Sequence, residues 1–213
     1  RVGDGVNYRL GAAVLRLGFE YLASMELTEH GRPIIDHLRD VSGYSAHLVV
    51  RDGREVVFVG KAPSRVASFH SIQVGARLPA HATVLGRLLL ADLDLAELKR
   101  LYPQSPLPAF TAQTPTTHED LLARAAQDRE RGYGVSQAGY ESGISTIAAP
   151  VHNEHRQTVA AVSITVPDQR VPEAELPRLI DQVKAAAAEL SARMSHAPNV
   201  GQSLPVTSEK TMV

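Results

Sequence analysis

Residues 144–167, ISTIAAPVHNEHRQTVAAVSITVP, decide the fold class of this chain. Two runs rich in β-branched and small apolar residues, ISTIAAPVH and TVAAVSITVP, lie on either side of the polar residues 153–156. Such a pair of runs around a short polar connection predicts two adjacent antiparallel strands. Because antiparallel neighbours need no crossover helix, this stretch favours an antiparallel sheet.

Alternation along the second run separates two kinds of side chain, because successive residues of a strand point to opposite faces. The aliphatic set is Val162, Ile164 and Val166, and the small, partly hydroxylic set is Ala161, Ser163 and Thr165. The same parity places Thr146 on one face with Ala148. In the predicted strand 66–74 it places His70 on one face with Ser68. If these polar sets converge, one sheet face can hold a small molecule; the alternative is a face open to solvent.

Turn and cap signals divide the rest of the chain into short elements. The Asp52-Gly53 dipeptide between two β-rich runs predicts a hairpin. Helices are expected over 7–25, from Thr28 to Gly43, after Thr83, over 94–102, from Thr117 to Arg131 and over 173–195. Hairpin-linked strands with helices gathered elsewhere indicate an α+β fold, and no Gly-rich nucleotide-binding motif is present.

Composition is typical of one cytoplasmic globular domain. The 213 residues are 44% hydrophobic with a formal net charge of −1, which gives no basic footprint for nucleic acid. The absence of cysteine excludes disulfides and thiolate chemistry. No run reaches the roughly 20 apolar residues of a membrane span, and the first residues lack a signal-peptide pattern. We therefore expect a cytoplasmic protein that does not contact a membrane.

Catalytic and metal-binding motifs are missing from the sequence. The nine histidines fall in no HExxH or similar metal motif, and no serine lies in a GxSxG elbow. We therefore expect no catalytic residue, no metal and no cofactor. The alternative is a hydrolase or lyase that uses Glu141 and His81 as acid and base. His81 is instead expected to orient its turn through a hydrogen bond.

The stretch LPAHATVLGRLLLA, residues 78–91, predicts the start of a helix with Thr83 as its N-cap. The first amides of a helix lack intrahelical partners and favour an anion, so those of Val84, Leu85 and Gly86 are candidates to bind a small carboxylate. The alternative is that Thr83 only caps the helix and that Gly86 permits close packing against a strand.

Three separated segments carry a family resemblance: YRLGAAVLRLG, LPAHATVLGRLLLA and RERGYGVSQAGYESGISTIAAPVHNEHRQTVAAVSITVP. In order and spacing they resemble the effector-binding domain of the isocitrate lyase regulator (IclR) family of bacterial transcription factors, over roughly residues 7–195. The resemblance implies a GAF-like antiparallel sheet flanked by helices and preceded by a linker helix. It also implies an N-terminal winged helix-turn-helix domain that this chain lacks.

The resemblance also implies how the chain is divided. Residues 1–6 would end the wing, 7–26 would form the linker helix, 27–195 the effector-binding domain and 196–213 a disordered C-terminal tail. The expected partners are a small-molecule effector and further copies of the chain, in a homodimer or homotetramer. Operator DNA is expected to be reached only through the absent domain.

The resemblance finally implies a ligand site. Members that bind small organic acids use two backbone amides and four polar side chains, which fall here on Val84, Leu85, Ser136, Thr146, Ser163 and Thr165, with His70 and Leu78 lining the pocket. Many relatives have an acidic pattern such as DxEE where this chain has Ser136, which makes a keto or hydroxy acid a less secure ligand. We expect a carboxylate-bearing catabolite, aromatic ones included, with His70 or His47 as a further contact. A pure oligomerisation module with a vestigial pocket is the remaining alternative.

Overall fold

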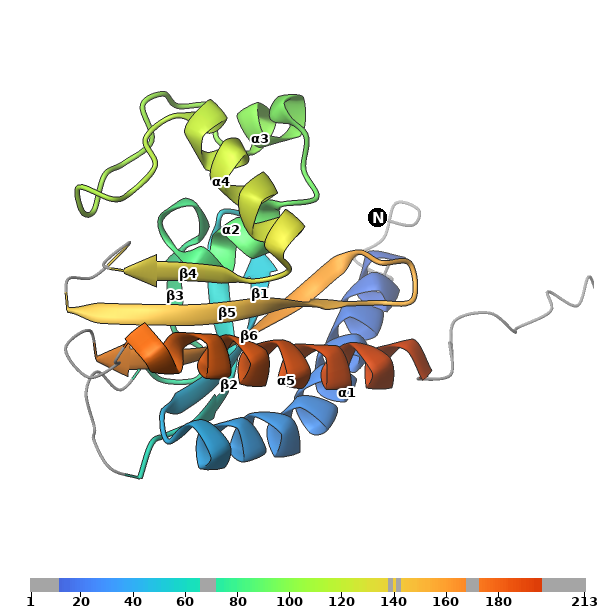
Figure 1. Cartoon of the computed structure of the whole chain (residues 1–213). Coiled ribbons are helices and arrows are strands. Elements are labelled where there is room, and N and C mark those ends of the chain that lie inside the picture. Colours follow the sequence, from blue (N-terminus) through green and yellow to red (C-terminus); the bar gives the residue numbers. More distant parts are fainter. Residues whose placement is uncertain (1–11, 66–71, 138–139, 141–142, 168–172, 197–213) are drawn as a thin grey trace, which may run out of the picture.

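A six-stranded antiparallel sheet forms the centre of the computed structural model, which describes residues 12–65, 72–137, 140, 143–167 and 173–196 (Figure 1). The strands are β1 (Ser45–Asp52), β2 (Glu55–Ala62), β3 (Arg77–Pro79), β4 (Gly134–Gln137), β5 (Ile144–His152) and β6 (Thr158–Pro167). Their order is β3-β2-β1-β6-β5-β4, and every neighbouring pair is antiparallel. The predicted α+β class is confirmed.

The stretch 144–167 forms the pair β5 and β6, as predicted. Its register runs from Ile144 opposite Pro167 to His152 opposite Thr158. β6 also pairs with β1, so the hairpin at the end of the sheet is joined to the hairpin formed by β1 and β2. This central pairing brings residues 45–49 beside residues 161–165, far apart in sequence.

Helices cover both faces of the sheet (Figure 1). On one face lie α1 (Ala12–Ser42) and α5 (Leu176–His196), and their core contains the aliphatic set of β6, Val162, Ile164 and Val166. On the other face lies α2 (Val84–Leu90), which shares a second core with Ala148 and Ala161. Ala161 and Ser163 are fully buried, so the alternative of a solvent-facing sheet is wrong at these positions.

The first helix differs from the prediction. Two helices were expected, one over 7–25 and one capped by Thr28, but α1 continues from Ala12 to Ser42 through Pro33. A proline inside a helix removes one backbone donor, a cost that packing can offset. Here Gly31 lets the helix approach Leu48 of β1 so closely that an added Cβ would collide with that side chain. The end at Gly43, with φ +80°, is as predicted.

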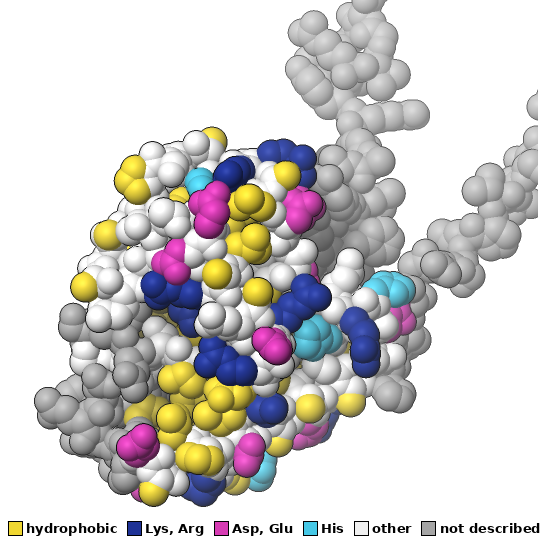
Figure 2. All heavy atoms as spheres, turned by 45° about the horizontal axis from the view of Figure 1, so that its top comes forward, with side chains coloured by type: hydrophobic (Ala, Val, Ile, Leu, Met, Phe, Trp, Pro, Cys, Tyr) yellow, Lys and Arg dark blue, Asp and Glu magenta, His cyan; other side chains and the backbone are white. Residues whose placement is uncertain are grey.

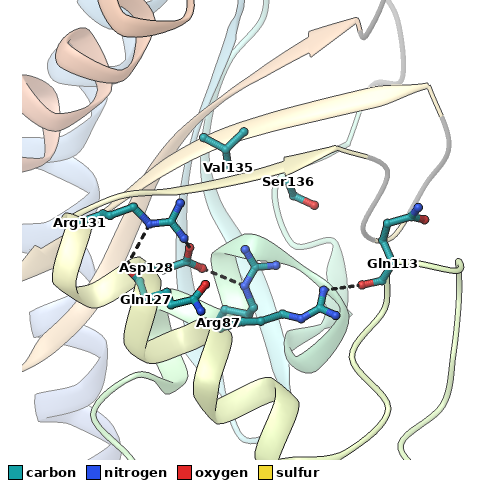
Figure 3. A pocket seen from close by; sticks show the side chains of 8 residues that line it. Arg87, Gln113, Gln127, Asp128, Arg131, Val135 and Ser136 are labelled. Carbon is teal, nitrogen blue, oxygen red and sulfur yellow. Dashed lines mark hydrogen bonds and ion pairs between the residues drawn. The ribbon is translucent and has the colours of Figure 1, made fainter.

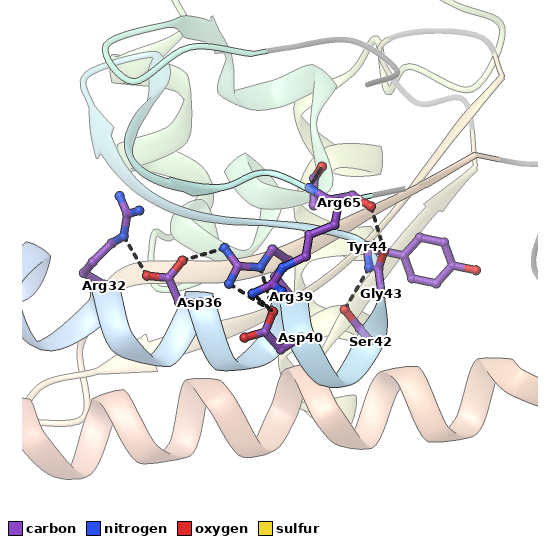
Figure 4. Close-up of polar contacts among 10 residues, drawn as sticks. Arg32, Asp36, Arg39, Asp40, Ser42, Gly43, Tyr44 and Arg65 are labelled. Atoms are coloured by element: carbon purple, nitrogen blue, oxygen red, sulfur yellow. Dashed lines mark hydrogen bonds and ion pairs between the residues drawn. The ribbon is translucent and has the colours of Figure 1, made fainter. Parts of the chain in front are cut away.

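Ion pairs connect charged side chains in the last turns of α1 to one another and to Arg65, which follows β2 (Figure 4). Arg39 donates to Asp36 at 2.8 Å and to Asp40 at 3.0 Å, and Arg65 lies 3.3 Å from Asp40. The hydrogen bond from Arg39 is the main cause of the lowered pKa of Asp40. The Arg39 side chain is only 14% exposed, but its partners Asp36 and Asp40 are 31% and 47% exposed, so each pair stabilises the domain little.

The first hairpin forms, with its turn one residue later than predicted. Asp52 pairs with Glu55, so the turn residues are Gly53, with φ +58°, and Arg54. Glycine in the first central position supplies the positive φ that a tight hairpin turn requires.

The strand predicted over 66–74 is not found in its described part. Residues 66–71, which include His70, lie outside the described residues, and 72–74 lie in coil and a turn. The strand β3 comes after Gly75, whose φ is +90° and whose N–H donates to the carbonyl of Phe58 at 2.7 Å. Phe58 of β2 therefore makes its backbone hydrogen bonds to residues 75 and 76 of this turn, and the strand begins only at Arg77.

The remaining helices follow their cap signals. They are α3 (Leu95–Leu101) and α4 (His118–Arg131), with a short 3-10 turn, η1 (Ala80–Ala82), before α2 and another, η3 (Glu173–Glu175), before α5. The hydroxyl of Thr117 accepts from the Asp120 N–H at 3.1 Å, and Gly132 ends α4 with φ +73°. Both caps confirm the expected boundaries of α4.

Candidate functional site

A row of hydroxyl side chains crosses four strands on the sheet face that α2 covers. The register places Ser136 opposite Thr146, Thr146 opposite Thr165, and Thr165 opposite Ser45. The next row on the same face contains Gly134, Ala148, Ser163 and His47. The structure thus brings together the four predicted polar side chains, Ser136, Thr146, Ser163 and Thr165, from three strands.

Ser163 is the most unusual member of these two rows. Its side chain is fully buried, and its Oγ has no hydrogen-bond partner among the described residues. A buried hydroxyl without a partner costs about 1–3 kcal/mol. Its neighbours in the row are the small Ala148 on one side and the imidazole of His47 on the other. Native proteins seldom retain such a group, and each case needs an explanation.

His47 lies beside Ser163 and is almost completely buried. Burial, and secondarily the charge of Lys61, lowers the pKa of His47 to about 4. The ring is therefore neutral at neutral pH, with one nitrogen as donor and the other as acceptor. Its Nδ1 lies 3.5 Å from the Thr165 hydroxyl, and its edge meets the Phe58 ring at a centroid distance of 5.5 Å.

The start of α2 lies over this face. The Thr83 hydroxyl accepts from the Gly86 N–H at 3.0 Å, which confirms the N-cap. Because the Gly86 N–H already donates to Thr83, it is not available to bind a carboxylate. The prediction that the amides of Val84, Leu85 and Gly86 are all available is therefore wrong for Gly86. Gly86 permits a close approach as proposed, but to the backbone of Ala80 in η1 rather than to a strand.

Leu78 lies at the edge of the sheet, away from the hydroxyl rows. It belongs to β3, pairs with Val56 and packs partly against the core beneath α2. Strands β2 and β1 separate it from β6. The role of Leu78 in lining a pocket stays a prediction, and His70 lies outside the described residues.

His81 has the structural contact expected of it. Its Nε2 lies 2.9 Å from the Pro108 carbonyl, so Nε2 is the donor, and its ring meets Tyr102 edge-on. The Nδ1 atom is buried without a partner among the described residues. Glu141, the acid proposed in the enzyme alternative, lies outside those residues.

A second polar feature, not predicted from the sequence, is an ion pair between α2 and α4. Arg87 Nε lies 2.8 Å from Asp128 Oδ2, and the two side chains are only 9% and 3% exposed. The signal in the sequence is an arginine inside the apolar run LGRLLLA, because a charge buried among leucines needs a partner. The partner, 41 positions further on, has no local signal.

The Arg87–Asp128 pair lines a cleft of about 320 Å³ at the edge strand β4 (Figure 3). The cleft is bordered by Arg87, Gln113, Arg124, Gln127, Asp128, Arg131, Val135 and Ser136. Ser136 therefore takes part in both the hydroxyl row and the wall of the cleft.

On the face in Figure 2, basic and acidic side chains are interspersed. Within the described ranges, no three His, Asp or Glu side chains form a group that could hold a metal ion. None of the helices described has both the length and the apolar character needed to cross a membrane.

Comparison with known proteins gives the class first. The C-terminal domain of the Escherichia coli transcriptional regulator KdgR superposes with a TM-score of 0.71 at 29% identity, covering 80% of this chain and 99% of that one. A double mutant of the PobR inducer-binding domain from Acinetobacter, in complex with 3-hydroxybenzoic acid, superposes with a TM-score of 0.68 at 28% identity, covering 75% of this chain and 94% of that one. The fold is thus that of effector-binding domains of bacterial transcriptional regulators.

The family follows from the sequence matches. Residues 19–192 match the model described as bacterial transcriptional regulator IclR C-terminal. The chain is also 32% identical over 190 residues to the HTH-type transcriptional regulator XynR of Escherichia coli, covering 89% of this chain and 75% of that protein. This chain belongs to the IclR family of transcriptional regulators and carries its C-terminal domain.

Proposed function

We propose that this domain binds a small organic acid between α2 and the hydroxyl rows, and thereby controls DNA binding by a separate N-terminal domain. The observation that carries the proposal is the orphaned Ser163 Oγ, fully buried on the face that α2 covers. A ligand oxygen in reach of that hydroxyl would remove the cost of leaving it without a partner.

The chemistry around Ser163 suits a carboxylate. Thr146 and Thr165 are half-buried hydroxyls of the neighbouring row and can donate to an oxyanion. The amides of Val84 and Leu85, in the first turn of α2, are the further donors that the family resemblance implies. His47, being neutral, can add one ring N–H without bringing a charge that must be neutralised.

The proposed ligand is a carboxylate-bearing catabolite, and aromatic acids are included. A double mutant of the PobR inducer-binding domain, which has this fold, accommodates the aromatic acid 3-hydroxybenzoic acid. The family resemblance implies an acidic residue in many relatives at the position of Ser136. A serine there carries no negative charge that would repel the carboxylate of the ligand. The proposal also includes homodimers or homotetramers of the whole regulator and no catalytic turnover.

Coupling to DNA would pass through α1. The helix packs on the sheet at Gly31 and continues toward the N-terminus without interruption as far as Ala12. A ligand shifts such a system only if it binds one arrangement more tightly than the other. The two arrangements would differ in how the α1 helices of paired subunits are spaced.

The test is a thermal-shift and calorimetric panel of small carboxylic acids, with 3-hydroxybenzoate, benzoate and pyruvate as probes and benzamide as the neutral match. At about 100-fold over its Kd, a binding acid should add about 2.7 kcal/mol to the free energy of unfolding, and benzamide should not. Ser163→Ala should weaken that binding about tenfold. The matched control is Ser195→Ala, on the exposed side of α5.

Two results would contradict the proposal. If no acid binds, the chain is an oligomerisation module with a vestigial pocket. If chromatography of the incubated acids shows a product that depends on the protein, the domain is an enzyme.

A further inference from the structure

The cleft beside β4 has unused cationic donors. Arg87 donates a hydrogen bond from its Nε to Asp128, and its two terminal nitrogens have no hydrogen-bond partner among the described residues. Neither of these nitrogens is one of the fully buried side-chain atoms that lack a partner in the described residues. Both are therefore accessible from the cleft that Arg87 lines. In Figure 3 the guanidinium lies between Asp128 and the space below Ser136.

The charges around this cleft do not balance. Arg124 pairs with Asp120 at 2.8 Å, and Arg131 reaches the other oxygen of Asp128 at 3.4 Å. Asp128 thus serves two guanidinium groups, and the three arginines of the lining face only two carboxylates in all. The cleft therefore has an excess of positive charge next to a deeply buried, preorganised arginine.

From these observations we propose that the cleft between α2, α4 and β4 is a second ligand site, which binds a small dicarboxylate. One carboxylate is held by the forked terminal nitrogens of Arg87, since a planar guanidinium matches a carboxylate with two parallel hydrogen bonds. The second carboxylate lies toward Arg124 and Arg131 at the mouth. A cleft of about 320 Å³ is at the lower end of small-molecule sites, which suits a ligand of this size.

The site is distinct from the proposed effector pocket and does not depend on it. Gly134 lies in the β4 row nearest the cleft, and both Val84 and Asp128 pack directly over it, so that an added Cβ would collide with Val84. Val84, whose amide belongs to the proposed effector pocket, is not among the residues that line the cleft. Only Ser136 belongs to both regions.

The experiment is calorimetric titration of the 213-residue chain with malonate, at ionic strength held constant with chloride. Acetate and inorganic phosphate are the comparison probes, and both should bind at least about tenfold more weakly than malonate. Arg87→Lys keeps the charge but loses the planar fork, and should weaken malonate binding about tenfold. Arg129→Lys is the matched control, because Arg129 is an exposed arginine of α4 outside the lining, and should leave the affinity unchanged.

A second variant covers the case in which Arg87→Lys fails to fold. Gln127→Glu changes an exposed residue at the mouth to a negative charge, and should weaken malonate binding by about tenfold through repulsion. The proposal is overturned if malonate binds no more tightly than acetate or phosphate. It is equally overturned if both cleft variants bind like the unchanged chain, or if Ser163→Ala abolishes malonate binding while Arg87→Lys retains it.

Discussion

The buried side chains of Arg87 and Asp128 form the ion pair that joins α2 to α4, with Arg87 Nε 2.8 Å from Asp128 Oδ2. Breaking a buried pair by removing one partner leaves a charge without compensation, whereas replacing both partners with apolar groups can be neutral. The ion pair therefore predicts that the changes in the free energy of unfolding caused by variants at Arg87 and Asp128 are strongly non-additive.

Asp128→Leu is expected to lower the free energy of unfolding by about 3–5 kcal/mol, because it leaves Arg87 charged and buried. The double variant Arg87→Met with Asp128→Leu should recover most of that loss. Urea denaturation measures both, with Asp181→Asn as an exposed control on α5. Additive losses in the double variant would mean that the pair contributes through packing alone.

His47 predicts a dependence of stability on pH. Burial lowers the pKa of His47 from 6.5 to about 4, so the unfolded chain binds more protons than the folded chain between these values. The stabilisation is complete above pH 6.5 and is lost as the pH falls toward 4, by about 3 kcal/mol in all.

Urea denaturation at pH 7 and pH 4 checks this expectation. His47→Gln should remove that part of the fall in stability, while the exposed His155→Gln should keep it. Equal pH profiles for His47→Gln and the unchanged chain would show that another group causes the fall.

Ser163→Ala is expected to raise the free energy of unfolding of the ligand-free domain by about 1 kcal/mol, because it removes a buried hydroxyl that has no partner. The same change weakens binding of the proposed acid, so stability and affinity move in opposite directions. Urea denaturation without ligand measures the first effect. A loss of stability would show that the hydroxyl is satisfied in the folded domain.

The helical glycines Gly86 and Gly31 are expected to differ in how much stability is lost when each is changed to alanine. At Gly86 an added Cβ would collide with the backbone of Ala80, which cannot move without displacing α2. Gly86→Ala should therefore cost about 1–3 kcal/mol or more. At Gly31 the obstacle is the flexible end of Leu48, and the helix gains up to about 1 kcal/mol from alanine, so Gly31→Ala should cost less. Thermal unfolding of both variants compares them, and an equal or larger loss for Gly31→Ala would contradict this account.

The local features of the fold could be predicted because they depend on neighbouring residues. The parity of 144–167 placed Ser163 and Thr165 on the face opposite Val162, and the caps at Thr83 and Thr117 were found from single side chains before apolar runs. The division of α1 into two helices was wrong, because helix–sheet packing, which involves residues far apart in sequence, keeps Gly31 and Pro33 within one continuous helix.

The sequence by itself determined the antiparallel α+β class, the two faces of β6 and the family, because alternation, caps and motifs are properties of contiguous residues. Only the tertiary structure decided that β1 lies between β2 and β6, that Ser163 is buried without a partner, and that Arg87 meets Asp128. These features depend on which distant surfaces pack together, and that choice minimises the exposed apolar area of the whole chain rather than of any one segment. The chemistry of both proposed ligand sites arises from these long-range contacts.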